Sequence, residues 1–305
     1  MRLRPVSARP AVRRRVGAFA LAPLLLVGSA CAPTEDADDE ATDSETGASD
    51  AEVTDPAACA EDAVRKPGTL TIATDSPAYE PWFTDNDPTT GEGFESAVAY
   101  EVAKRLGFDA DAVTWVTVPF NTSYKPGPKE FDFDINQISV TPERAERVDF
   151  SSGYYSAAQA VIALEENAAA QATSLEDLKG LRLGAQTGTT SLTAIRDQIQ
   201  PDAEISVFED TNAAKQAMMN DQVDAIVADL PSAFYITAAE IPQASITGQF
   251  QPDSEDQETF GLLFEKGSEL VGCVDAALAE MDTDGTLAQL QQAWLSDTVG
   301  VPELQ

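Results

Sequence analysis

The 305-residue sequence contains no histidine. This absence excludes Ser-His-Asp and Cys-His catalysis and every histidine-ligated metal site. The three cysteines are too few for a four-thiolate zinc site or, alone, for an iron–sulfur cluster. Neither a P-loop nor a Gly-x-Gly-x-x-Gly motif occurs, so the sequence offers no motif for nucleotide binding. We therefore expect neither a metal nor a cofactor.

Basic residues are also scarce: 19 lysines and arginines stand against 52 aspartates and glutamates, which gives a formal net charge of −33. A chain this acidic repels phosphates and anionic lipid headgroups, so we expect no nucleic-acid partner. Residues 63–305 alone carry 13 basic and 40 acidic residues, spread along the chain as on a solvated surface suited to high salt. The 43% of hydrophobic residues predicts one or two compact domains and excludes a fibrous or wholly disordered chain.

The first residues of the chain have the composition of an export signal. Residues 1–31 carry six arginines and no acid, and a mostly apolar run of fifteen residues extends from Val16 to Ala30. This run is shorter than the ~20 residues that a membrane span needs. Basic residues followed by a short apolar stretch and small residues are typical of a secretory signal, which we predict at residues 1–30.

Cys31 follows this run directly, in the sequence Val-Gly-Ser-Ala-Cys. The pattern resembles a bacterial lipobox, whose cysteine is diacylated and becomes the mature N-terminus, although Gly28 stands where leucine is usual. The alternative is an ordinary signal peptide with a cysteine by chance. Residues 32–62 contain twelve acids and no base, so residues 31–62 are predicted to be a lipidated cysteine and an acidic, disordered tether. The folded part would then be exported and anchored to the outer face of the cell membrane through the lipid only.

Strands and helices alternate through the rest of the chain. Apolar, β-branched runs predict strands at 70–74, 113–118, 131–138, 157–164, 181–185, 225–228 and 260–264, and another that opens at Val207. Helical spacing and capping residues predict helices at 94–106, 192–199 and 213–220, one starting at Thr141, and two between 269 and 294. This alternation predicts an α/β fold with mostly parallel sheets. Similar units on either side of residues 157–164 indicate two lobes.

Six stretches of sequence carry a resemblance to a known family. They are, in order, LTIATDSPAYEPW, GFESAVAYEVAKRLG, ISVTPERAERVDFSSGYY, LRLGAQTGTT, VDAIVAD and DGTLAQLQQAW. Over residues 67–298 this order resembles bacterial solute-binding proteins of family 3, the amino-acid-binding components of ABC importers. The resemblance implies a two-lobed, periplasmic-binding-protein-like (type II) fold that closes around its ligand at two crossing hinge strands. Lobe 1 is then predicted at 63–158 plus 258–305, and lobe 2 at 159–257.

The resemblance also implies how a free amino acid would be held. Arg144 would bind the carboxylate, because a guanidinium fork matches two oxygens; the alternative is a surface arginine at a helix start. Asp229 ends a buried strand, where α/β sheets bind ligands, and would bind the ammonium group; the alternative is a helix cap before Pro231. Ser139 and backbone N–H groups near Thr190 would assist Arg144.

Other residues are expected around the side chain of the ligand. The predicted ligand-binding set is completed by Asp75, Tyr79, Phe120, Asn136, Gln137, Gln186 and Thr189. Two features depart from the family pattern: Pro126 and Pro128 exclude a regular helix after Phe120, and Asn136-Gln137 stands where two small residues are usual. A buried polar group without a partner costs ~1–3 kcal/mol, so we expect a polar ligand, with glutamine-like or basic amino acids ahead of acidic or branched apolar ones.

Two cysteines remain if Cys31 is lipidated. In an exported protein disulfides persist, and the family fold implies that the last helices return to lobe 1. Cys59 and Cys273 could then meet in a disulfide; the alternative is two separate buried thiols.

Three classes of function fit these observations. We favour a receptor that delivers a free amino acid to the permease subunits of an ABC importer, and we expect it to be a monomer without enzymatic activity. An enzyme on the same fold, dehydratase-like or associated with cell-wall lyases, is the second class, but no spare acid–base pair is evident. A ligand-sensing module is the third. It would be expected to need a membrane-spanning segment after the binding domain, and the sequence after Leu295 does not predict one.

Overall fold

The structure, a computed structural model, describes residues 53–251, 258–295 and 301–305. The predicted signal segment, Cys31 and the tether up to residue 52 lie outside these ranges. The end of the predicted tether is helical, since α1 spans Pro56–Ala63. Asp55 caps this helix by accepting a hydrogen bond from the backbone N–H of Ala58, and Pro56 opens it. The prediction of disorder up to residue 62 is therefore wrong from Pro56 onward.

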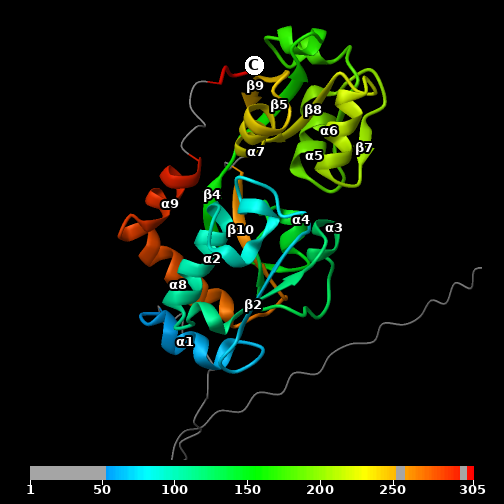
Figure 1. Ribbon diagram of the computed structural model, residues 1–305. Helices are drawn as coiled ribbons and strands as arrows, with labels where there is room; N and C mark the ends of the chain where they lie inside the picture. The colour runs from blue at the N-terminus through cyan, green and yellow to red at the C-terminus, as the bar shows by residue number, and fades with distance from the viewer. Residues whose placement is uncertain (1–52, 252–257, 296–300) are drawn as a thin grey trace, which may run out of the picture. The chain divides into compact units, whose positions relative to one another are not determined.

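Lobe 1 is built on a five-stranded sheet (Figure 1). Its strands, in sheet order, are β2 (Val113–Thr117), β1 (Leu70–Thr74), β3 (Phe133–Asp134), β10 (Thr259–Phe264) and β4 (Asp149–Ser156). The apolar runs that predicted β1 and β10 are almost entirely buried, as strands covered on both faces require. β1 pairs in parallel with β2 and β3, whereas β10 is antiparallel to both of its neighbours.

Lobe 2 repeats this arrangement with different segments of the chain. Its sheet order is β7 (Ser206–Phe208), β6 (Leu183–Gln186), β8 (Ala225–Asp229), β5 (Gln159–Leu164) and β9 (Ala244–Phe250). β6 pairs in parallel with β7 and β8, and β5 is antiparallel to both of its neighbours. In each sheet, therefore, only the fourth strand runs against the others. That strand, β10 or β5, is the first strand after the chain crosses from the other lobe.

Helices complete both lobes. Lobe 1 contains α2 (Phe94–Arg105), α3 (Phe120–Ser123), α4 (Pro142–Ala145), α8 (Leu270–Thr283) and α9 (Thr286–Leu295), and lobe 2 contains α5 (Thr190–Ala194), α6 (Thr211–Met219) and α7 (Leu230–Tyr235). Two π-helical turns, η6 (Ile195–Ile199) and η7 (Ile236–Glu240), continue α5 and α7. Short 3₁₀ turns lie at 84–86, 88–90, 110–112, 168–171 and 176–178. Among the described residues, no helix is both long and apolar enough to cross a membrane.

The predicted strand at 131–138 is much shorter in the structure. Only Phe133 and Asp134 pair in the sheet, because Gln137 has φ 46° and turns the chain out of extended geometry. Ser139 then forms an isolated bridge to Phe260 of β10. Strands β4 and β9 were not predicted. The sequence of β4, DFSSGYYS, lacks the apolar run that predicts a strand, and it is extended because it pairs with β10.

The C-terminal residues correct the predicted lobe boundaries. Residues 258–295 pack in lobe 1, but Leu304 is buried in a lobe 2 cluster. The backbone N–H of Leu304 donates to Gln249 O of β9 at 2.9 Å, and Gln249 N donates to Pro302 O at 2.8 Å. Assigning 258–305 as a whole to lobe 1 is therefore wrong for residues 301–304, which extend the lobe 2 sheet.

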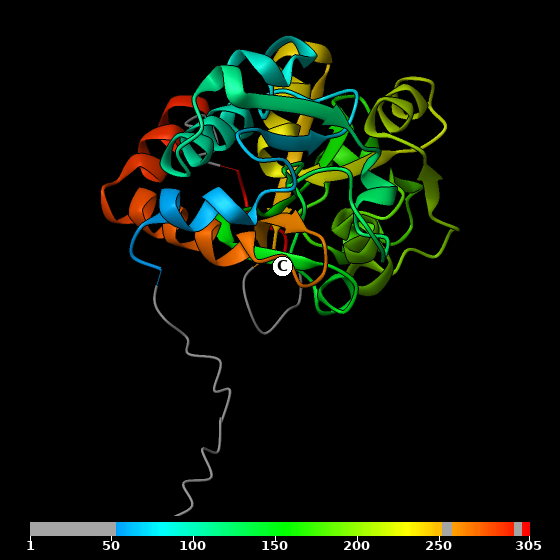
Figure 2. The same ribbon diagram turned by 90° about the horizontal axis from the view of Figure 1, so that it is seen from below.

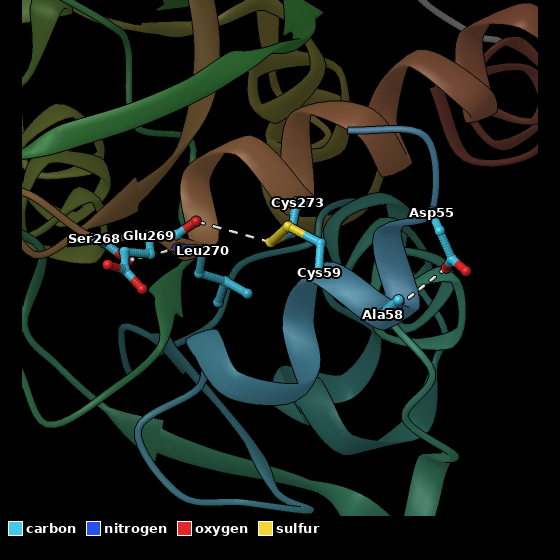
Figure 3. The surroundings of a disulfide bond; sticks show 7 residues. All are labelled: Asp55, Ala58, Cys59, Ser268, Glu269, Leu270 and Cys273. Carbon is cyan, nitrogen blue, oxygen red and sulfur yellow. Dashed lines mark hydrogen bonds between the residues drawn. A yellow bond between two sulfur atoms is a disulfide. The ribbon is translucent and has the colours of Figure 1, made fainter. Parts of the chain in front are cut away.

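The predicted disulfide is present and joins α1 to α8 (Figure 3). Cys59 and Cys273 have Cα atoms 5.5 Å apart and are separated by 214 residues in the sequence. Figures 1 and 2 both show α1 beside α8. The bond therefore ties the first described helix to the helix that follows the second crossing between lobes.

Candidate ligand-binding site

One pocket collects residues from both lobes. Lobe 1 supplies the ends of β1 and β3 and the start of α3, and lobe 2 supplies the loop before α5, the end of β8 and the face of α7. Ten of the eleven predicted ligand-binding residues line it: Asp75, Tyr79, Phe120, Asn136, Gln137, Ser139, Gln186, Thr189, Thr190 and Asp229. The resemblance thus brought together residues up to 154 positions apart, because the strand ends of both sheets face the same space.

Arg144 is the predicted residue that does not line the pocket. Its side chain is 7% exposed and lies behind Ser139, where Nη1 donates to Ser139 O at 2.6 Å. Nη2 donates to Gly188 O of lobe 2 at 2.9 Å. The guanidinium also stacks on two rings, with Cζ 5.5 Å from the centroid of Phe120 and 5.0 Å from that of Tyr124. Arg144 is therefore buried and hydrogen-bonded to both lobes beside the pocket residue Ser139.

The loop that begins α5 carries hydroxyl groups. Thr189 Oγ1 accepts from the backbone N–H of Leu192 at 3.1 Å and donates to Gln186 O at 2.8 Å, so it caps the helix. Thr190 Oγ1 lies 3.3 Å from Ser139 Oγ across the pocket. Hydroxyl groups of both lobes thus approach each other near Arg144.

Asp229 belongs to a hydrogen-bonded chain of buried polar groups. Gln159 Nε2 donates to Asp229 Oδ1 at 2.8 Å and lies 3.2 Å from Glu258 Oε2, while Ser139 Oγ donates to the other oxygen of Glu258. Burial and the neighbouring negative charge of Glu258 raise the pKa of Asp229, and the positive charge of Arg144 opposes this. A ligand ammonium beside Asp229 would relieve two carboxylates at once. Glu258 was not predicted, although it stands directly before β10.

A second buried carboxylate lies under the pocket in lobe 1. Glu95 is fully buried and accepts hydrogen bonds from Tyr154 Oη, Gln137 Nε2 and Gln137 N, the last at 2.7 Å. These bonds hold Gln137 in its positive-φ conformation. Burial raises the pKa of Glu95 to about 7 despite the hydrogen bonds, which act in the opposite direction. Asp134, also fully buried, has a pKa well above its ordinary value, because of burial and of the charges of Glu95 and Asp75.

Asp75 is used mainly to hold the pocket wall. Its Oδ2 accepts from the backbone N–H of Phe120 at 3.1 Å, and its Oδ1 accepts from Ser76 N at 2.6 Å. The end of β1 is thereby joined to the start of α3, which positions the Phe120 ring. Helix α3 ends at Ser123, before the two prolines that excluded a longer helix.

The remaining part of the pocket contains charged residues that the sequence did not reveal. Lys215 of α6, Glu240 of η7 and Glu80 all line it, together with Tyr79. Lys215 Nζ lies 2.7 Å from each carboxylate oxygen of Glu240 and 5.7 Å from the centroid of the Tyr79 ring. No local motif marks these residues; the spacing of residues 232, 235, 236 and 240 on one helical face after Asp229 is the signal that could have indicated Glu240.

Hydrogen bonds join the lobes around the pocket. Trp82 Nε1 of lobe 1 donates to Ser232 Oγ of α7 at 2.8 Å, in addition to the bond from Arg144 to Gly188. A Cβ atom at Gly188 would lie 2.7 Å from Asn121 Oδ1, and φ is +75° there, so this position needs glycine for the lobes to approach.

Known proteins share this architecture. Residues 70–297 match the family described as bacterial extracellular solute-binding proteins, family 3. The L-cystine-binding protein TcyJ of Escherichia coli (strain K12) is 27% identical over 239 residues, which cover 77% of this chain and 86% of that protein. A solved structure of an ancestral arginine-binding protein bound to glutamine is 29% identical with a TM-score of 0.64, covering 76% of this chain and 100% of that one.

A second solved structure adds a link to an enzyme. It is an ancestral amino acid-binding protein described as a precursor of cyclohexadienyl dehydratase, 31% identical with a TM-score of 0.61, and it covers 74% of this chain and 95% of that one. Together with the two five-stranded sheets, these likenesses confirm the predicted two-lobed type II fold.

Proposed function

Because the chain belongs to the bacterial extracellular solute-binding proteins of family 3, we propose that it binds a free amino acid outside the cell and delivers it to an ABC importer. The observation that supports the proposal is a pocket lined by Asp229 of lobe 2 and Ser139 of lobe 1, whose backbone carbonyl accepts a hydrogen bond from Arg144. Closure of two lobes around a small ligand is the motion that such a pocket permits.

In the proposed complex the part of the pocket that contains Asp229 and Ser139 binds the backbone groups of the ligand. Asp229 accepts hydrogen bonds from the ammonium group, which compensates the negative charges of Asp229 and Glu258. The carboxylate binds the hydroxyl groups of Ser139 and Thr190. Arg144 donates to Ser139 O and Gly188 O next to these hydroxyl groups, so its guanidinium supplies positive charge close to the bound carboxylate.

The walls favour a polar ligand. Asn136, Gln137 and Gln186 offer amide groups, and Asp75 and Glu80 add negative charge. A relative named for L-cystine and a neighbour that binds glutamine support this choice. A branched apolar side chain would leave the buried Nδ2 donor of Asn136 without a partner.

We propose binding without turnover. Asp75 holds the pocket wall, Lys215 pairs with Glu240, and Asp229 is assigned to the ligand. The relatives compared are also mainly binding proteins. The neighbour related to a dehydratase precursor defines the alternative. Incubation with the tightest ligand, followed by mass spectrometry of the small molecules, separates the two, because a receptor returns the ligand unchanged.

The location and partners follow from the same proposal. Export through segment 1–30 and lipidation of Cys31 would hold a monomer at the outer face of the membrane, near the permease subunits that receive the ligand. A Cys31→Ser variant should leave the membrane fraction. If this variant still sediments with membranes, the lipid anchor is excluded.

The clamp is tested by calorimetry. Arg144→Ala should weaken binding of the best amino acid by roughly 30- to several-thousand-fold, since removing one side of a desolvated charge pair costs ~2–5 kcal/mol. Arg147→Ala is the matched control, because Arg147 is exposed and only three residues away. A change of less than about threefold for Arg144→Ala would show that the clamp is assigned wrongly.

A further inference from the structure

Trp82 has no part in the proposed clamp, although it ends the first of the six stretches that carry the family resemblance. It is fully buried in lobe 1 and is not one of the described residues that line the pocket. Its ring makes T-shaped contacts with Tyr155 of β4 and Phe260 of β10, and both pairs of ring centroids are 5.6 Å apart. Strands β4 and β10 border the two crossings between the lobes. Trp82 is therefore anchored in lobe 1 next to the crossings.

The backbone of Trp82 is fixed as well. Trp82 O accepts hydrogen bonds from Glu95 N at 2.9 Å and from Ser96 N at 3.3 Å, at the start of α2. Gly93 permits this close approach, since a Cβ atom there would lie 2.5 Å from Trp82 O. The indole is thus held on the lobe 1 side by both ring packing and backbone hydrogen bonds.

The indole N–H of Trp82 reaches the other lobe. Trp82 Nε1 donates to Ser232 Oγ of α7 at 2.8 Å. An indole nitrogen is a donor only, so a buried indole N–H without an acceptor costs free energy. Ser232 lies three residues after Asp229, which is the N-cap of α7, and both residues line the pocket. The bond therefore connects lobe 1 to the helical turn that follows the predicted ammonium acceptor.

Two roles are possible for the Ser232 hydroxyl group. As a direct ligand contact, it would act whether or not Trp82 is present. As the acceptor of the indole N–H, it would act only through Trp82. The second role agrees with the geometry, because the indole is fixed in lobe 1 and aims its N–H at Ser232. A hydrogen bond of this kind is lost beyond ~3.5 Å, so a rotation that parts the lobes would break it.

We propose that Trp82 and Ser232 are positioning residues that form a latch, a hydrogen bond that holds lobe 2 closed over the bound amino acid. Ser232 acts in this latch through Trp82 and not on the ligand. The inference rests on the proposed receptor function and adds the residues that set how long the ligand stays bound. Because the bond forms only when the lobes close, it affects the rate of dissociation and not that of association.

Stopped-flow kinetics on the purified folded chain test the latch. The probe is whichever of the twenty standard amino acids and L-cystine binds most tightly in a thermal-shift panel. Ser232→Ala should raise the dissociation rate constant of this probe about three- to tenfold, the effect of one buried neutral hydrogen bond. The association rate constant should change less than twofold. An unchanged dissociation rate constant, or an effect confined to association, would overturn the latch.

A double-mutant cycle separates the latch from direct contact with the probe. Trp82→Phe keeps an aromatic ring but removes the N–H. In this background, Ser232→Ala should change the dissociation rate constant less than twofold. A change of twofold or more there would mean that Ser232 contacts the probe, and would overturn the proposal. Trp115→Phe is the matched control, because Trp115 Nε1 donates to Tyr100 Oη within lobe 1 at 3.2 Å. It should leave both rate constants within twofold of the parent.

Failure of the receptor function gives a different result. If no member of the panel binds, the receptor function is overturned, and small-angle X-ray scattering of the ligand-free chain decides the latch. Ser232→Ala should then increase the radius of gyration relative to the parent, because the lobes lose a bond that favours closure. An unchanged radius would overturn the latch. The same measurement decides the matter if Trp82→Phe does not fold.

Discussion

The two lobes share one topology but are filled with different side chains. Each sheet has the same order and places its crossing strand fourth and antiparallel. Among the described residues, the main lobe 1 cluster contains eight aromatic residues and six alanines, whereas the two lobe 2 clusters together contain one aromatic residue and twelve alanines. The order of strands therefore depends on pattern and chain crossings, while the size of the core residues is free to differ.

The difference extends beyond the cores. Lobe 1 contains the disulfide and a network of T-shaped ring contacts around Trp82, such as those with Phe94 and Phe260 at 6.0 and 5.6 Å. Lobe 2 contains the two π-helical turns, η6 and η7. We infer that lobe 1 is the more stable body and that lobe 2 adjusts around the ligand.

Removing the disulfide should cause the largest loss of stability in lobe 1 relative to lobe 2. The loop-entropy relation gives about 5 kcal/mol for a bridge that closes so long a loop, as an upper value. The Cys59→Ser/Cys273→Ser variant should therefore unfold at much lower urea concentration than the parent. Hydrogen exchange should show lost protection in α1 and α8 with little change in β6 and β8. Equal loss in both sheets would mean that the bond stabilises the protein as one unit.

A matched pair of core truncations should have the next largest effect. Phe133→Ala removes a fully buried ring whose centroid lies 6.1 Å from that of Phe264. The truncation should lower the free energy of unfolding by about 3–5 kcal/mol. Phe250→Ala removes a buried ring of lobe 2 that makes no such ring contact among the described residues, and its cost should fall at the lower end of that range. Urea denaturation of both variants gives the values. Costs that are equal, or larger for Phe250, would contradict a special role for ring packing in lobe 1.

The buried acid of lobe 1 predicts a dependence of stability on pH. The pKa of Glu95 is about 7 in the folded state, against 4.5 for the ordinary group. The folded state therefore holds a proton that the unfolded state releases, so this contribution is present below about pH 4.5 and is lost as the pH rises to about 7. The loss is about 3 kcal/mol.

Urea midpoints of the ligand-free protein measured between pH 5 and pH 8 check this prediction. The midpoint should fall as the pH rises. Glu95→Gln serves as the control, because it keeps the size of the side chain and should remove the part of the slope that Glu95 contributes below about pH 7. Asp134 and Asp229, whose pKa values are also raised, account for the slope that remains. An unchanged slope in Glu95→Gln would rule out Glu95 as its source.

Overpacking lobe 2 should have the smallest effect of the series. Ala160 is fully buried on β5. Ala160→Val adds two methyl groups to a close-packed core and should cost about 1–3 kcal/mol. A neutral or stabilising result from thermal unfolding would mean that the alanine-rich core has unfilled space. The lower stability inferred for lobe 2 would then come from packing defects rather than from small side chains.

The elements that could be predicted from the sequence are those whose own residues determine them. The apolar run of β1 and the capping Thr141 act locally, so β1 and α4 lie where expected. Strand β4 could not be predicted, because its polar residues are extended only by pairing with β10. Helix α1 was hidden in an acidic stretch, although Asp55 and Pro56 carried a start signal.

The candidate site divides in a similar way. Asp229 lines the pocket as expected, because strand ends in α/β sheets face ligands, and its role stays a prediction from the family resemblance. Lys215 and Glu240 were missed because they come together only when α6 packs beside η7. Arg144 was expected in the pocket itself, but the backbone carbonyls of Ser139 and Gly188 draw its guanidinium behind the wall. The sequence thus indicated which residues lie near the site, but not which of their side chains line the pocket.

The attachment of residues 301–304 to β9 has a practical consequence. Helix α1 is bonded to lobe 1 through Cys59, whereas Leu304 is held by lobe 2. Labels placed near these two positions are therefore attached to different lobes. The distance between the labels changes when the lobes close or open. A donor dye beside Asp55 and an acceptor dye after residue 305 would convert the arrival of a ligand into a change in energy transfer. The ends of the folded chain are thus natural positions for an optical reporter that leaves the pocket untouched.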